Sequence, residues 1–134
     1  MTDRDPISHR FPKAARLLRP REFRHVYETG LSKSIGPLHL FAAPNHLDHT
    51  RIGLSVSRRV GIAVRRNRIK RLLREAFRLA RPALPHGYDL VINVRPHPPL
   101  TLDEYRTILT RALDNLDQRW RTKTKHPPPT GEPA

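Results

Sequence analysis

The sequence has no cysteine, which excludes disulfide bonds, zinc–thiolate sites and thiol nucleophiles. It also has no apolar run approaching the roughly 18–20 residues of a membrane-spanning helix, so we expect no membrane contact. Acidic residues are few, because 12 Asp and Glu stand against 26 Lys and Arg, for a net charge of +14 with neutral histidines. Residues 1–11 lack the apolar segment of a secretory signal, and we expect a cytoplasmic protein.

The length of 134 residues suits one domain with one hydrophobic core. We expect a basic, extended N-terminal segment over residues 1–16 and a folded domain over residues 17–121. Residues 122–134 are rich in proline and show no apolar periodicity, so we predict that they form a disordered tail.

The spacing of apolar residues predicts three helices. The first runs from Pro20 to Thr29, because proline suits the first helical position and Gly30 favours termination. The second spans Arg66–Arg81 and ends at Pro82. The third begins at the capping-box pattern Thr101–Glu104.

Alternating apolar residues predict strands over residues 38–43, 51–57 and 88–95, with a short additional strand over residues 31–35. We expect the strands at 38–43 and 51–57 to pair as a hairpin. The strands at 51–57 and 88–95, with the helix between them, form a βαβ unit, whose crossover the general rule makes right-handed. The order α-β-β(-β)-α-β-α predicts an α/β (α+β) two-layer sandwich, in which three helices accompany a mixed sheet of three to four strands.

Residues 58–81 form an unusually basic segment, with nine arginines and one lysine against a single acid, Glu75. A solvated helix face normally mixes charges of both signs, whereas here Glu75 is expected to neighbour only Arg71. Cations at this density favour a polyanionic partner, and we interpret the segment as a nucleic-acid surface that suits DNA and RNA equally. The predicted surface residues are Arg58, Arg59, Arg65, Arg66, Asn67, Arg68, Lys70, Arg71 and Arg74.

Three aromatic residues form a second candidate site. Phe23 and Tyr27 lie four positions apart and share one face of the first helix, while Phe41 shares a strand face with His39. The helical spacing alone favours packing into the core. An aromatic side chain on a polar sheet face beside a helix can instead stack on unpaired bases, so both interpretations stay open.

The sequence shows no combination of residues typical of a catalytic centre. No Ser, His and Asp set, paired carboxylates or cluster of metal ligands is apparent. His46 and His49 lie three positions apart in a turn, and we interpret them as solvated loop residues. We therefore expect no catalytic residue and no metal ion bound by the protein alone.

The longest recognisable pattern runs from Arg51 to Phe77 and reads RIGLSVSRRVGIAVRRNRIKRLLREAF. It resembles the signature of the bacterial ribonuclease P protein component. The upstream segment from Phe23 to Tyr27, followed by Gly30, resembles the first helix of the same family. The similarity covers roughly residues 17–118.

The resemblance implies an RNA-binding subunit, monomeric within a ribonucleoprotein, that helps a catalytic RNA to remove the 5′ leader from precursor tRNA. The catalytic centre would lie in the RNA, which would hold most of the Mg²⁺. The basic segment would dock on the catalytic RNA, and Phe23, Tyr27 and Phe41 would line a cleft for the leader. The family also implies a left-handed βαβ crossover. Two alternatives remain from the residues alone, a basic structural protein of ribosome or nucleoid and a self-sufficient nuclease.

Overall fold

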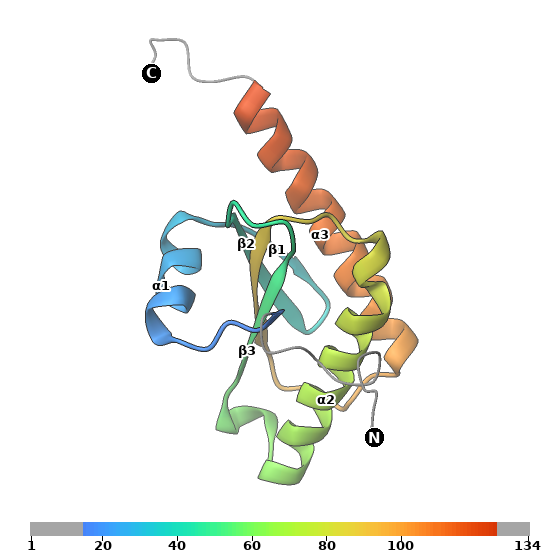
Figure 1. Ribbon diagram of the computed structural model, residues 1–134. Coiled ribbons are helices and arrows are strands. Elements are labelled where there is room, and N and C mark those ends of the chain that lie inside the picture. Colours follow the sequence, from blue (N-terminus) through green and yellow to red (C-terminus); the bar gives the residue numbers. More distant parts are fainter. Residues whose placement is uncertain (1–14, 126–134) are drawn as a thin grey trace, which may run out of the picture.

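A four-stranded sheet lies between helices in this computed structural model, which describes residues 15–125 (Figure 1). Helices α2 and α3 pack on one face of the sheet, and the shorter α1 covers part of the other face. The elements are α1 (Pro20–Thr29), β1 (Leu31–Ile35), β2 (Leu38–Pro44), β3 (Arg51–Val56), the 3₁₀ turn η3 (Arg58–Val60), α2 (Ala63–Ala80), the 3₁₀ turn η4 (Arg81–Ala83), β4 (Tyr88–Val94) and α3 (Leu102–Lys125).

The strand order in the sheet is β1-β2-β4-β3. β1 pairs antiparallel with β2, and β2 pairs antiparallel with β4, whereas β3 and β4 are parallel. The predicted hairpin between β2 and β3 is therefore wrong, because β4 lies between them. The hairpin joins β1 to β2 instead, and its turn uses Gly36 at a φ of 56°. The alternation of apolar residues shows which face of a strand is buried, but it does not determine which other strand pairs with it.

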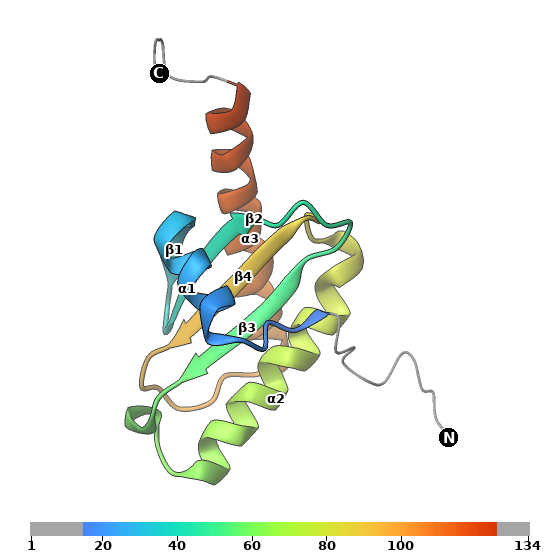
Figure 2. The same ribbon diagram turned by 60° about the vertical axis from the view of Figure 1, so that its left-hand side comes forward.

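β3, α2 and β4 form the predicted βαβ unit. Figure 2 shows α1 in front of the sheet and α2 behind it, with β3 and β4 running in the same direction and β4 on the side of β2. This arrangement makes the crossover left-handed, as the family resemblance implies and contrary to the general rule.

The main hydrophobic core lies between the sheet and the two long helices. α2 contributes the fully buried Ile69, Leu73 and Phe77, and α3 contributes the fully buried Leu109 and Leu113. This core holds α2 by one face and leaves its opposite face to solvent.

The helix ends differ from the predicted ones in two places. α2 starts at Ala63, three positions before the predicted Arg66, and passes at Ala80 into η4, which contains Pro82. α3 continues through Lys125, so residues 122–125 are helical and the prediction of a tail is wrong for them. The rest of the predicted tail and residues 1–14 lie outside the described residues.

The predicted capping box of α3 is confirmed. The backbone N–H of Glu104 donates to Thr101 Oγ1 at 3.1 Å, and the N–H of Thr101 donates to Glu104 Oε1 at 2.9 Å.

A charged network attaches α1 to the sheet. Arg51 of β3 donates from Nε and Nη2 to both carboxylate oxygens of Asp89 on β4, at 2.8 and 2.7 Å. Its Nη1 also reaches Glu22 of α1 at 3.3 Å. Glu22 accepts the backbone N–H groups of Leu18 and Arg19, so it closes the start of α1 as well.

The ionised form of Glu22 is favoured by this network. Burial, the largest single effect, raises the pKa of Glu22. The hydrogen bonds from the Arg19 and Leu18 backbone and the charge on Arg51 together outweigh burial, so the pKa is lowered overall. The ion pair with Arg51 is therefore present at neutral pH and is lost as the pH falls through the lowered pKa.

Replacing Asp89 with asparagine tests how much this network contributes. Asp89→Asn keeps the side-chain size but leaves the largely buried guanidinium of Arg51 without its main counter-charge. We expect the free energy of unfolding, measured in urea, to fall by about 3 kcal/mol. The matched control is Asp103→Asn, because Asp103 is exposed and its contact with Arg106 is 3.8 Å long. This control is expected to change stability by less than about 0.5 kcal/mol. Equal effects of the two changes would show that the network does not hold α1.

Candidate nucleic-acid interface

The structure gathers all nine predicted surface residues on α2 and the η3 turn before it. The core side of α2 is fully apolar, so its cations occupy the remaining circumference. Arg58 and Arg59 are exposed on η3. The exposed members on α2 are Arg65, Asn67, Arg68 and Arg71, and the half-buried members are Arg66, Lys70 and Arg74.

Glu75, the acid in this segment, pairs with Arg78. Nε and Nη2 of Arg78 donate to the two carboxylate oxygens of Glu75, at 2.9 and 2.6 Å. The hydrogen bond to Glu75 raises the pKa of Arg78. The expectation that Glu75 neighbours only Arg71 is thus wrong, because the i,i+3 geometry brings Arg78 to the carboxylate. Among the described residues, no ion pair involves a cation between Arg65 and Arg74.

One half-buried cation of α2, Arg74, lies near another arginine, Arg16. Arg16 forms an isolated bridge with Ile52 of β3, and this segment is held by a 2.9 Å hydrogen bond from Leu17 N–H to the Ile52 carbonyl. Burial lowers the pKa of Arg74, and the like charge of Arg16 lowers it further. The Nε of Arg66 is buried and has no hydrogen-bond partner among the described residues. Such a concentration of like charge favours binding of an anion.

The aromatic residues meet on the opposite face of the sheet, under α1. The rings of Tyr27 and Phe41 are 5.0 Å apart and perpendicular, at 88°. The Tyr27 hydroxyl donates to Asn93 Oδ1 at 2.6 Å, and the His39 ring lies 4.4 Å from the Phe41 ring. Tyr27 is 39% exposed, so part of its ring remains open to a ligand.

Phe23 lies deeper than Tyr27. It is half-buried and packs with Leu17, Val26 and Val91. A Cβ at Gly53 would come within 2.6 Å of Phe23 Cζ, so the ring lies directly against the strand backbone. The structure therefore divides the predicted aromatic set, with Phe23 packed mainly against protein and Tyr27 more open.

Polar side chains continue the aromatic site across the sheet. His39 pairs with Asn93 and with Ser34 in the strand register, and Ser55 pairs with Asn93 on the other side. These four residues therefore form one row on the face that α1 partly covers. Burial lowers the pKa of His39, and the charge on Arg95 lowers it further, so His39 is neutral at pH 7.

The sequence comparisons identify the family. Residues 11–117 match the model of the family Ribonuclease P. The chain belongs to this family. The ribonuclease P protein component of Chloroflexus aurantiacus is 40% identical over 120 residues, which cover 90% of this chain and 85% of that one. That of Chloroflexus aggregans is 47% identical over 83 residues, or 62% of each chain.

A solved structure agrees with the family assignment. The Staphylococcus aureus RNase P protein, in a mutant with defective mRNA degradation activity, superposes with a TM-score of 0.70 at 29% identity. The match covers 78% of this chain and 90% of that one. This chain is therefore a protein subunit of ribonuclease P, a tRNA-processing enzyme, and the alternative of a ribosomal or nucleoid protein is set aside.

The described part of this ribonuclease P protein contains no evident metal centre. Between residues 15 and 125, no group of three or more His, Cys, Asp or Glu side chains is placed to hold a metal ion. In the turn that carries His46 and His49, the exposed Asp48 contacts His49 Nδ1 at 2.9 Å. Within the same part of the chain, no helix has both the length and the apolar character needed to cross a membrane.

Three contributors to the two surfaces were missed by the sequence interpretation. Asn93 interrupts the apolar run from Leu90 to Val94 in β4, and that exception was an available signal. Gly53 likewise interrupts a strand pattern, which often marks a close approach to the backbone. Nothing in the sequence pattern placed Arg16 beside α2, because their contact joins segments far apart in the chain.

Substituting Gly53 tests the seating of Phe23. Gly53→Ala places a methyl group 2.6 Å from Phe23 Cζ and 3.1 Å from Leu17 Cβ, so α1 must shift. We expect a loss of about 1–3 kcal/mol in the free energy of unfolding. Elsewhere in a strand, exchanging glycine for alanine stabilises by about 0.5–1 kcal/mol, so a loss is diagnostic. Ser55→Ala, at an exposed position on the same strand face, is the control. Stability at or above the wild-type value for Gly53→Ala would contradict the close contact.

Proposed function

We propose that this ribonuclease P subunit docks on the catalytic RNA through η3 and α2 and holds the 5′ leader of precursor tRNA between α1 and the sheet. The observation that carries the docking is the series of cations from Arg65 to Arg74 that have no acidic partner among the described residues. The open ring of Tyr27 against Phe41, beside a polar row, supports the leader site.

Docking by α2 would be largely electrostatic. Guanidinium groups make paired hydrogen bonds to phosphate, and each neutralised phosphate releases counterions into solution. Phosphate contacts carry little sequence information, so they set affinity and orientation. The exposed Arg58, Arg59, Arg65, Arg68 and Arg71 are free of the geometric restraint that half-burial places on Arg66, Lys70 and Arg74.

Leader binding would depend on stacking. An unpaired base has a flat apolar face that can lie on the exposed part of Tyr27, with Phe41 at the side. Because every base has such a face, stacking tolerates many leader sequences. The neutral His39 and the amide of Asn93 lie next to this position and would contact the polar edges of a bound nucleotide.

The catalytic centre in this proposal lies in the RNA, which holds most of the Mg²⁺. The protein would act by positioning the leader and by raising the local positive charge, as a monomer within a cytoplasmic ribonucleoprotein. Cleavage of precursor tRNA by the protein after complete removal of RNA would overturn this division of roles and favour a self-sufficient nuclease.

Removing two exposed arginines tests the docking surface. Arg68→Ala combined with Arg71→Ala should weaken binding to the catalytic RNA. If both side chains contact phosphate, the slope of log affinity against log salt should fall by about 1.4–1.8. The measurement is a binding titration at several salt concentrations. Arg106→Ala with Arg111→Ala on α3 is the matched control, because both are exposed cations outside α2. Equal losses for the two pairs would show that docking depends on total charge alone.

Removing one aromatic ring tests the leader site. Tyr27→Leu keeps apolar volume but removes the stacking face, and we expect the assembled enzyme to bind precursor with a long leader about fivefold to tenfold more weakly. Binding of a substrate with a one-nucleotide leader should not change. His25→Leu is the control, because His25 is exposed on α1 and lies two positions from Tyr27, about 200° around the helix. If Tyr27→Leu weakens both substrates equally, the leader does not bind at Tyr27.

A further inference from the structure

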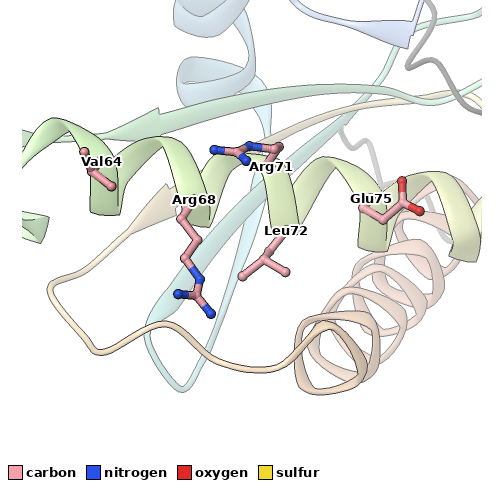
Figure 3. A pocket seen from close by; sticks show the side chains of 5 residues that line it. All are labelled: Val64, Arg68, Arg71, Leu72 and Glu75. Carbon is pink, nitrogen blue, oxygen red and sulfur yellow. The ribbon is translucent and has the colours of Figure 1, made fainter.

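A hollow of about 610 Å³ lies on the solvent side of α2. Val64, Arg68, Arg71, Leu72 and Glu75 line it, all from this one helix. Figure 3 shows Arg68 and Leu72 reaching to one side of the helix and Arg71 to the other, with Val64 towards the start of the helix. Two aliphatic side chains, Val64 and Leu72, therefore share the hollow with the side chains of Arg68 and Arg71.

The exposure of the aliphatic groups has no explanation in phosphate binding. Val64 is 73% exposed on a helix whose solvent side is otherwise strongly basic. Leu72 is only partly covered by the main core, so its outer part contributes to the hollow. Phosphate groups gain nothing from an aliphatic neighbour, whereas a flat apolar surface does.

We propose that this hollow receives one unpaired nucleobase of the catalytic RNA. The proposal rests on the docking surface proposed above and assigns to it a contact of a different kind. The base would place its ring face on Val64, and Leu72, two turns further along α2, would close the far end of the hollow. The planar guanidinium of Arg68 or Arg71 would stack on the ring or hold the phosphate of the same nucleotide.

The charge and size of the site fit this occupant. The two arginines attract a nucleotide and disfavour a cationic or purely aliphatic ligand. A volume of about 610 Å³ lies within the range typical of small-molecule sites, which leaves room for one base without rearranging α2. A contact with a base, in contrast to a phosphate contact, gives the docking surface a preference for one position on the RNA.

The test compares two exposed aliphatic residues at the start of α2, Val64 and Ile62. Val64→Thr keeps the β-branched shape but places a hydroxyl in the hollow. Ile62→Thr makes the same kind of change at a side chain that is 74% exposed and does not line the hollow. The full-length variants are titrated against the catalytic RNA at several salt concentrations, and circular dichroism checks that both remain folded.

We expect Val64→Thr to weaken binding about tenfold, because an unpaired hydroxyl would lie against an apolar ring face. The salt slope should stay at the wild-type value, since no phosphate contact is lost. Ile62→Thr should bind like the wild type. Chemical probing of unpaired bases should show one nucleotide of the catalytic RNA that is protected by the wild type and by Ile62→Thr, and is reactive with Val64→Thr.

Several results would overturn the inference. These are wild-type affinity for Val64→Thr, equal losses for the two threonine variants, or a Val64-dependent protection found in the substrate leader instead of the catalytic RNA. The docking proposal fails separately, if Arg68→Ala with Arg71→Ala leaves both affinity and salt slope unchanged. If the double arginine variant loses binding and Val64→Thr behaves like the wild type, the base contact is rejected and the docking proposal stands.

Discussion

Repulsion between the cations of α2 is the constraint on which the rest of the structure depends. A helix with this charge gains little from its own side-chain pairs, because Glu75 is taken by Arg78 and lies near the end of the series. Its stability has to come from the opposite face, where Ile69, Leu73 and Phe77 are fully buried. Each such side chain contributes about 1.5–3 kcal/mol on burial, whereas repulsion between exposed charges is screened by salt over about 8–10 Å. The core therefore holds the helix, and its positive charge stays available to a polyanion.

The two proposed RNA contacts meet at one end of the sheet. The polar row beside the aromatic residues reaches Ser55, near the end of β3, and Arg58 begins η3 three positions later. The chain then turns into α2 on the other face of the sheet (Figure 2). An RNA strand that left the aromatic residues along this row would arrive at the first cations of the proposed docking surface. This continuity would let one rigid sheet set the distance between the bound leader and the catalytic RNA.

Local chemistry made much of this fold predictable, and contacts between distant segments account for what was missed. The start of α1 at a proline and the capping box of α3 depend on neighbouring residues, and both were predicted correctly. The partner of β3 depends on which strand arrives beside it, and the alternation of Ile52 and Leu54 fits β2 as well as β4. The handedness of the crossover came from the family resemblance, because composition and periodicity carry no sign of it. The nine candidate surface residues, eight of them cations, were found by charge density, whereas Arg16 was not, since only the folded chain brings it to α2.

The aromatic site shows why helical spacing leaves core packing and ligand binding unresolved. Phe23 and Tyr27 are four positions apart and share a face of α1, so periodicity treats them alike. What separates them is the strand residue opposite each ring. Gly53 has no side chain, which lets Phe23 sink onto the backbone, whereas Asn93 binds the Tyr27 hydroxyl and keeps that ring at the surface. Phe23 therefore anchors α1 to the sheet, and this anchoring holds the exposed ring of Tyr27 in place beside Phe41. A ring fixed in this way loses little conformational entropy when a base stacks on it, so one buried aromatic residue improves the binding surface offered by its neighbour.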